Sequence, residues 1–399
     1  MSNDTQPEIR FPGFTEAWEQ RKLSDVASIV GGGTPSTSNP EYWDGDIDWY
    51  APAEIGDQIY VNKSLKTITE LGQQKSSAKI LPIGTVLFTS RAGIGNTAIL
   101  AKEGTTNQGF QSIVPHENKL DSYFIFSRTH ELKRYGEVTG AGSTFAEVSG
   151  KQMAKMPILI PYIDEQRKIG AFFGQIDEAI ALHQRKLDLL KETKKGFLQK
   201  MFPKNGAKVP EIRFPGFTKD WEERKLGDVF SERSERSSEG ELISVTINSG
   251  VIKASELDRK DNSSDNKSNY KKVEVGDIAY NSMRMWQGAS GYSSYEGILS
   301  PAYTVIIPKE GTDSKFFAYD FKRYDMIQTF KRNSQGLTSD TWNLKFPTLK
   351  LVKIMVPSIE EQKQIAAFFE RLDNTIALHE RELDVLKETK KGFLQKMFV

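Results

Sequence analysis

The chain has 399 residues, of which 38% are hydrophobic and 27% charged, and it contains no cysteine. This length suits two or three domains, and the composition is that of a globular protein rather than a disordered one. The missing cysteines exclude disulfides, zinc–thiolate sites and cysteine nucleophiles. A net charge of +1 excludes binding to nucleic acid by bulk positive charge, so any such binding needs local clusters or partner proteins.

The N-terminal residues MSNDTQPEIR lack the basic and apolar regions of a secretory signal. No run of about 18 apolar residues, the length that crosses a bilayer, occurs in the sequence. The absence of cysteine also fits a reducing compartment. We therefore expect a cytoplasmic protein with no membrane partner.

The first element along the chain is a head, PEIRFPGFTEAWEQRKLSDV at 7–26, which recurs at 210–229 with 16 of 20 positions identical. A longer segment, 163–202, recurs at 359–398 with 28 of 40 identical, and LKETKKGFLQKMF is repeated in it letter for letter. The interiors between these repeats share little sequence. Two constant frames around different interiors predict one scaffold that presents two specificities.

The first interior is expected to be mixed α/β with short strands, at DIDWYAP, GTVLFTS, NTAILA and FQSIVP, bounded by Gly, Pro and Asn. DSYFIFSRTHELKRYGEV at 121–138 is predicted to be a helix. The loops of the first interior combine glycines with hydroxyls, amides and an arginine, groups that suit phosphate and base-edge contacts. The candidates are Thr34, Ser36, Thr37, Asn39, Arg91, Asn107, Gln108, Ser143 and Thr144. Exposed turns, an arginine–carboxylate pair and side-chain caps are the plainer alternatives.

The repeated segments are rich in Glu, Gln, Lys, Leu and Ala and follow a proline, which predicts two long helices. Apolar residues alternate at spacings of four and three over about four heptads, as in a coiled-coil seam. The seam positions are Ile169, Phe173, Ile176, Ile180, His183, Leu187 and Leu190, then Ile365, Phe369, Leu372, Ile376, His379, Leu383 and Leu386. A glycine near each end, Gly196 and Gly392, leaves fraying of the last turns open.

Each seam contains one histidine, His183 or His379, for which fixing the register is the preferred interpretation. A metal or catalytic role would need neighbours that neither helix sequence offers. Forty helical residues span about 60 Å, so an antiparallel pair would serve as a spacer. The alternative is that each helix packs on its own domain as an ordinary core element.

The second interior repeats the order of strands followed by a helix, with strands expected at ELISVTI, GDIAYNS and AYTVIIP and a helix at 314–332. After the strand GDIAY comes NSMRMWQGASGY, in the position that TSRAGIGNT occupies in the first interior. The further DNA-binding candidates are Arg284, Trp286, Gln287, Thr338 and Ser339.

Catalytic motifs are absent from the sequence. There is no GxxxxGK[ST], HExxH or GxSxG, and the four histidines lack metal-ligand spacing. NPEYW lacks the second proline of the adenine-methyltransferase motif NPP[FY]. We therefore expect neither catalysis nor a metal site in this chain.

The duplicated frame resembles the specificity subunit of type I restriction-modification enzymes. The resemblance rests on the two heads, on the helix starts PYIDEQRKI and PSIEEQKQI, and on GGGTPSTSNPEYW and TSRAGIGNTAIL. It implies an α/β (α+β) fold with two similar target-recognition domains and two long helices in an antiparallel coiled coil with pseudo-twofold symmetry. The expected segments are target-recognition domains at 1–162 and 206–358 and spacer helices at 163–205 and 359–399.

The resemblance also implies a function. Each domain would read one half of a split site in double-stranded DNA, and the helices would set the spacing and dock two methyltransferase subunits. Those partners would carry S-adenosylmethionine and methylate adenine, and motor-nuclease subunits would use ATP and Mg. The repeated LKETKKGFLQKMF is then interpreted as two equivalent docking surfaces. The alternatives are a coiled-coil scaffold that binds other proteins, and a DNA enzyme, which the missing motifs disfavour.

Overall fold

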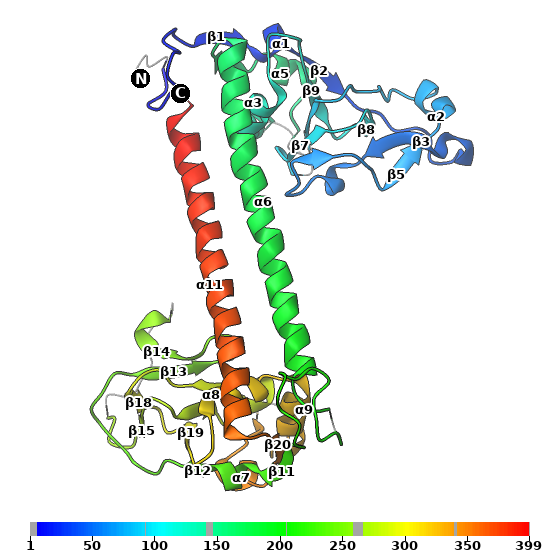
Figure 1. Ribbon diagram of the computed structural model, residues 1–399. Coiled ribbons are helices and arrows are strands. Elements are labelled where there is room, and N and C mark those ends of the chain that lie inside the picture. The colour runs from blue at the N-terminus through cyan, green and yellow to red at the C-terminus, as the bar shows by residue number, and fades with distance from the viewer. Residues whose placement is uncertain are drawn as a thin grey trace. The chain divides into compact units, whose positions relative to one another are not determined.

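The computed structural model describes residues 6–91, 93–140, 147–204, 206–257, 266–338 and 341–398, and Figure 1 shows its elements. The chain forms two compact units. Unit 1 consists of residues 1–184 and 382–399, and unit 2 of residues 185–381. Each unit therefore contains one globular domain together with parts of both long helices. Candidate residues Ser143, Thr144 and Ser339 lie outside the described residues.

The domain of unit 1 is built on a five-stranded sheet of order β2-β9-β6-β7-β4, beside which β5-β3-β8 form a second sheet. The strands are β2 (Ala27–Gly31), β3 (Trp43–Tyr50), β4 (Tyr60–Val61), β5 (Lys66–Ile68), β6 (Val86–Phe88), β7 (Thr97–Leu100), β8 (Thr105–Thr106) and β9 (Gln111–Pro115). The helices are α1 (Leu23–Val26), α2 (Glu70–Gln74), α3 (Ser122–Ser127), α4 (Thr129–Gly140) and α5 (Gly150–Ala154), with 3-10 turns η1 (Pro40–Tyr42) and η2 (Pro52–Glu54).

The domain of unit 2 repeats the central order with β12-β19-β16-β17 and then diverges. Its strands are β12 (Phe230–Glu232), β13 (Ile243–Thr246), β14 (Gly250–Lys253), β15 (Lys271–Val273), β16 (Ile278–Asn281), β17 (Ser290–Tyr292), β18 (Gly297–Leu299) and β19 (Tyr303–Pro308). Its helices are α7 (Leu226–Val229), α8 (Ser314–Asp320), α9 (Tyr324–Asn333) and α10 (Phe346–Leu349), with η3 (Ala254–Glu256) and η4 (Met285–Gln287). The mixed α/β class with two similar domains is confirmed.

Each domain begins and ends on one two-stranded ribbon. In unit 1, β1 (Glu19–Lys22) pairs antiparallel with β10 (Pro157–Ile160), and in unit 2, β11 (Glu222–Lys225) pairs with β20 (Lys353–Val356). The first strand of each ribbon belongs to the repeated head, and the second leads into a long helix. The ribbon therefore ties the head to the start of the helix in both units.

The segments predicted as single helices at 121–138 and 314–332 are each two helices, α3 and α4 or α8 and α9. In unit 1 the break falls at Arg128, whose side chain is 3% exposed. Its guanidinium bonds Glu131 and the carbonyl of Leu159. A buried arginine that reaches the β10 backbone requires a bend at this point, and residue-by-residue helix propensity does not detect it.

The two long helices, α6 (Ile163–Lys200) and α11 (Ile359–Lys396), continue unbroken through Gly196 and Gly392. A Cβ added at either glycine would meet nothing within 4 Å. The fraying left open by the sequence is therefore not seen. All fourteen seam positions are buried or half-buried, and none is exposed.

Within unit 1, the first part of α6 and the last part of α11 run antiparallel. The rings of Phe172 and Phe393 meet edge to face at 5.0 Å, and Asp177 pairs with Lys390 at 2.6 Å. In unit 2 the last part of α6 and the first part of α11 repeat this arrangement, with Phe197 against Phe368 at 5.1 Å. An antiparallel helix pair is therefore present in each unit.

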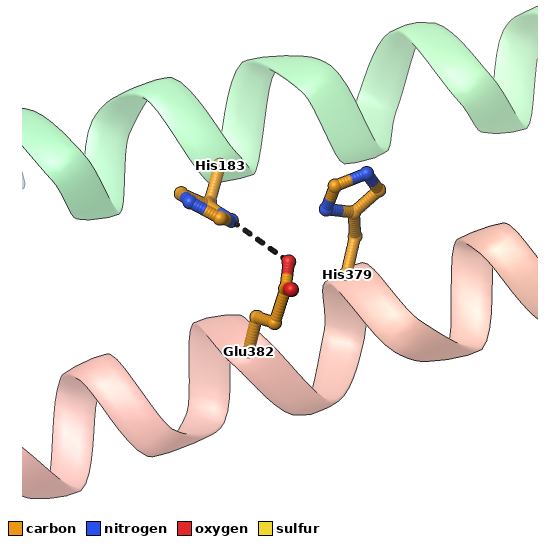
Figure 2. Close-up of side chains that lie close together, drawn as sticks. All are labelled: His183, His379 and Glu382. Carbon is orange, nitrogen blue, oxygen red and sulfur yellow. Dashed lines mark ion pairs between the residues drawn. The ribbon is translucent and has the colours of Figure 1, made fainter.

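His183 of the seam faces a carboxylate of the other helix within unit 1 (Figure 2). Its Nδ1 lies 3.5 Å from Oε2 of Glu382, an ion pair when the imidazole is protonated. Glu382 lies on the other helix, so the sequence around His183 does not reveal it as a neighbour. His379, in unit 2, is buried.

The repeated motif ends inside the hydrophobic cores. Met397 and Phe398 are buried in the core of unit 1, and Met201 and Phe202 in that of unit 2. Phe398 packs against Phe173 with ring centroids 5.7 Å apart. Burying a side chain of this size contributes about 1.5–3 kcal/mol. The apolar end of LKETKKGFLQKMF is thus core in both copies, an internal reason for the repeat besides docking of partners.

The repeated head is held to each helix start by an arginine fork. Arg10 makes two 2.7 Å bonds to the carboxylate of Glu165, and Arg213 does the same with Glu361. Both glutamates are 1% exposed. The Glu165 hydrogen bond, opposed by burial, raises the pKa of Arg10. Because a buried carboxylate needs a bidentate partner to offset its desolvation, the head and helix must be present together.

Candidate nucleic-acid interface

In unit 1 the glycine-rich stretch after β2 packs directly on the strand β8. The amide of Gly33 donates to the carbonyl of Thr106 at 2.8 Å, and the indole of Trp49 donates to the carbonyl of Gly33 at 2.8 Å. A Cβ at Gly32 would lie 1.9 Å from the carbonyl oxygen of Asn107. These glycines are therefore required by close packing, and the polar residues that follow them are placed against the 105–111 loop.

Thr34 and Gln108 meet at this point, since the threonine hydroxyl donates to the Gln108 side chain. Asn107 uses its side-chain oxygen to accept from the amide of Gly109 at 2.7 Å, which is the turn-capping role. Of the remaining candidates in this stretch, Ser36 and Thr37 are exposed. Asn39 precedes η1 and accepts from the amide of Tyr42.

Arg91 lies between the loops at 107–109 and 147–148. It forms an isolated antiparallel bridge with Glu147, while Ser90 donates its amide to the Gly109 carbonyl at 2.8 Å. The carbonyl of Ser90 accepts from the amide of Val148 at 3.0 Å. Segments that are well separated in the sequence thus converge around Arg91.

In unit 2 the turn after β16 holds Arg284, Trp286 and Gln287 together. The guanidinium of Arg284 donates to Oε1 of Gln287 at 3.2 Å, and the indole of Trp286 donates to the carbonyl of Met283 at 3.0 Å. Gly288 closes the turn with φ 85°, a conformation that favours glycine. The three candidates form one surface cluster.

The segment after α9 runs beside this turn. The amide of Leu344 donates to the carbonyl of Ser282 at 2.8 Å, the counterpart of the Val148–Ser90 bond in unit 1. Trp342 lies edge to face on Trp286 at 5.2 Å, and the ammonium of Lys331 lies 5.6 Å from the Trp342 ring. Exposed Thr338 bonds Thr341 in the same segment.

Trp342 and Lys331 are not among the residues predicted from the sequence for this cluster. A tryptophan in a polar loop is a usable signal, because aromatic faces beside cations are suited to stacking on bases and sugars. Lys331 lies in the last turn of α9, and no sequence pattern distinguishes it from the other lysines. Its position over Trp342 depends on the fold.

The comparisons with known proteins bear on the whole chain. The family model described as "Type I restriction modification DNA specificity domain" matches residues 15–192 and again 218–388. The chain belongs to this family. The match covers most of both units and most of both long helices, in agreement with the resemblance noted for the heads and helix starts.

Among curated relatives of this family, the MjaIX specificity subunit of Methanocaldococcus jannaschii is 32% identical over 231 residues, 54% of this chain and 52% of that protein. The EcoR124I/EcoR124II specificity subunit of Escherichia coli is 30% identical over 167 residues, 40% of this chain and 41% of that protein. The alignments thus span about half or less of these relatives. A solved S subunit from M. genitalium has a TM-score of 0.61 at 15% identity, with 99% of both chains covered, which shows the fold.

No helix among the described residues combines the length and apolar character needed to cross a bilayer.

Proposed function

We propose that this chain is the DNA sequence-specificity subunit of a type I restriction-modification complex. Its two domains each read one half of a bipartite site. The observation that carries the proposal is the matched position of two unlike loop clusters. Arg91 follows β6, and the cluster of Arg284 and Trp286 follows β16, in domains that share the same framework.

The candidate residues divide by chemistry. Hydroxyls and exposed amides such as Ser36, Thr37 and Gln108 suit phosphate and sugar contacts, which position a domain without reading sequence. Arginines 91 and 284 suit the paired acceptors of guanine in the major groove. Different side chains at one framework position then give the two domains different half-sites.

This chain would determine which DNA sequence is bound, and partner subunits would catalyse the reactions. Two methyltransferase subunits would bring S-adenosylmethionine and methylate adenine, and motor-nuclease subunits would use ATP and Mg. The support is the family membership together with the absence of catalytic motifs in the sequence.

The test is to purify the chain with its methyltransferase subunits and to map methylated adenines on genomic DNA. A single bipartite motif with a fixed gap is expected, and its loss when this chain is omitted. Replacing residues 230–358 with the interior of another family member should change one half-site and leave the other. Methylation that is unaffected by omitting the chain would contradict the proposal.

The long helices would set the gap between the half-sites. One heptad inserted after Gln184 in α6 and one after Arg381 in α11 keeps the seam in phase and leaves the contacts within each unit intact. Seven helical residues add about 10.5 Å, or about three base pairs at 3.4 Å each. The gap should lengthen while both half-sites stay the same; altered half-site bases would contradict the spacer role.

A further inference from the structure

The domain of unit 1 contains a pair of tryptophans with a lysine beside it. The rings of Trp43 and Trp49 meet edge to face with centroids 5.1 Å apart, and the ammonium of Lys66 lies 5.7 Å from the centre of the Trp43 ring. The indole of Trp49 donates to the carbonyl of Gly33 at 2.8 Å, and that of Trp43 donates to the carbonyl of Ser36 at 3.2 Å. Trp49 is 7% exposed, whereas Trp43 is half-buried. Trp49 is therefore the buried support, and Trp43 is the ring at the surface.

The domain of unit 2 contains the same three-part arrangement. The rings of Trp286 and Trp342 lie edge to face at 5.2 Å, and the ammonium of Lys331 lies 5.6 Å from the Trp342 ring. The indole of Trp286 donates to the carbonyl of Met283 at 3.0 Å. Here Trp286 is the support, and Trp342 is the ring that the lysine accompanies.

The two arrangements occupy different places in the shared framework. Trp43 begins β3 and Lys66 begins β5, whereas Trp286 lies in η4 and Lys331 in α9. Of the six tryptophans in the chain, two belong to the repeated heads, and the other four form these two pairs. A contact inherited with the framework would stand at equivalent positions. Its recurrence at unrelated positions, in interiors that share little sequence, indicates a function that both domains need.

Both lysines are available to a partner outside the chain. Their side chains are exposed, and neither ammonium forms a hydrogen bond or an ion pair among the described residues. Each therefore keeps three N–H donors for an external acceptor. An acidic protein would need the cations alone, and the rings beside them call for a partner that is anionic and also offers a flat apolar face.

Both arrangements adjoin residues that the proposed function assigns to DNA. Exposed Ser36 and Thr37 lie in the loop that leads to Trp43, and Ser36 bonds its indole. In unit 2, Arg284 and Gln287 are the neighbours of Trp286 in the turn after β16. The bases of a duplex present only their edges in the grooves, so a ring at the protein surface reaches deoxyribose rather than the base faces.

We propose that each domain binds the sugar–phosphate backbone of double-stranded DNA beside its half-site, with the surface tryptophan on a deoxyribose and its lysine on the adjoining phosphate. The residues are Trp43 with Lys66 in unit 1 and Trp342 with Lys331 in unit 2. The inference rests on the proposed function, from which it takes that both domains bind DNA. Such contacts position a domain without reading sequence, and base reading is left to the arginines of the loop clusters.

The first test measures the affinity of the complex with methyltransferase subunits for duplex DNA over a range of salt concentrations. Each phosphate contact contributes about 0.9 to the slope of log affinity against log salt concentration. Lys66→Met and Lys331→Met should each make the slope shallower by about 0.9, and the double variant by about twice that. Lys331→Arg keeps the charge and should keep the slope. Unchanged slopes in both methionine variants would overturn the proposal.

A lysine of the repeated head provides the matched control. Lys168 is exposed, and its ammonium lies 5.4 Å from the Phe11 ring and 5.5 Å from the Phe14 ring. Lys168→Met therefore removes the same charge and the same kind of lysine–ring contact outside the two arrangements. Its slope should equal that of the unmodified complex. A slope as shallow as that of Lys66→Met would show a general effect of charge and would also overturn the proposal.

Hydroxyl-radical footprinting on a duplex with the methylated motif locates the contacts, because it reports which deoxyriboses are covered. Lys66→Met and Trp43→Ala should lose protection beside the first half-site only, and Lys331→Met and Trp342→Ala beside the second only. The methylated motif should stay the same in all four. The lysine variants keep both rings, so they report the contact even if a tryptophan variant folds poorly. Loss of protection at the opposite half-site, or an altered motif, would contradict the assignment.

The salt titration is repeated on a duplex without the motif, which separates this inference from the proposed function. Methylation of a bipartite motif with unchanged slopes keeps the proposed function and removes the backbone contacts. Shallower slopes on both duplexes, with no bipartite motif methylated, keep the backbone contacts and remove the half-site assignment. A complex that binds neither duplex removes both.

Discussion

The two units make the same contacts to the long helices with different residues. In unit 1, Tyr123 lies two residues after the α3 cap Asp121 and donates to Asp177 at 2.8 Å. In unit 2 the donor to the matching Asp373 is Tyr319, which lies six residues after the α8 cap Asp313. The two positions, two and six residues after the cap, are about one helical turn apart and lie on the same face of the helix. A tyrosine at either position can therefore reach the aspartate.

The arginines that cover the docked phenylalanines differ in the same way. The guanidinium of Arg128 lies 5.7 Å from the Phe398 ring, and that of Arg323 lies 4.7 Å from the Phe202 ring. Arg128 ends α3, whereas Arg323 precedes α9. Both units thus make a tyrosine contact and an arginine contact to the same positions of the long helices. The residues that make these contacts stand at different places in the two interiors. The candidate loops of the two domains share no such common contact, and their side chains differ in chemistry.

The largest effect is expected from removing the docked rings. Phe202→Ala should destabilise unit 2 by about 3–5 kcal/mol, as for other large core truncations. Phe398→Ala should cost less in unit 1, because Phe398 is 8% exposed whereas Phe202 is 1% exposed. Hydrogen exchange by mass spectrometry should localise each loss of protection to one unit. The exposed Val385→Ala is the control, and equal loss in both units would contradict the assignment.

Loss of the arginine fork is expected to cost a slightly different amount of stability in each unit. Removing either glutamate leaves a mostly buried arginine without its partner, at about 3–5 kcal/mol. Glu361 also accepts from the indole of Trp221 at 3.3 Å, whereas the indole nitrogen of Trp18 has no hydrogen-bond partner among the described residues. Glu361→Ala should therefore cost about 1 kcal/mol more than Glu165→Ala. Urea unfolding measures both, and equal costs would show that the Trp221 bond adds nothing.

The loop clusters should act independently. Arg284→Ala should weaken or relax the second half-site by about 1–3 kcal/mol, and Arg91→Ala should do the same only to the first. Methylation maps of the two variants give the affected bases. Arg332→Ala, on the exposed end of α9, is the control for loss of charge. A variant that changes neither the motif nor the affinity removes its arginine from the interface.

The sequence predicted the frame because its signals are local and duplicated. The heptad spacing of Ile169 to Leu190 indicates a long helix without any knowledge of the fold, and the head and helix repeats indicate two similar domains. The ribbon strand Glu19–Lys22 has no such signal: all four residues are exposed, and it is a strand only because β10 lies beside it. Nor does sequence show that Phe398 packs beside Phe173, since the two are 225 residues apart.

The candidate site was predicted less completely than the frame. From the sequence, the glycines before Thr34 were interpreted as part of a loop suited to phosphate contacts, and the structure shows that close packing also requires them. Arg284, Trp286 and Gln287 were found because they are adjacent in the chain. Trp342 is distant from them in the sequence and reaches Trp286 only through the fold. The residues around position 286 therefore do not predict it.

The smallest predicted effect tests whether the contacts can move between positions. Tyr123→Phe leaves Asp177 paired with Lys390 at 2.6 Å, so it should cost only about 1 kcal/mol, and Tyr319→Phe, with Lys194 on Asp373, should match it. Ser127 occupies in α3 the position that Tyr319 holds in α8, six residues after the cap. Ser127→Tyr should therefore restore stability to the Tyr123→Phe variant, measured by urea unfolding. If the double variant is no more stable than Tyr123→Phe, the position of the hydroxyl along the helix is fixed by each domain, and the aspartate does not select it.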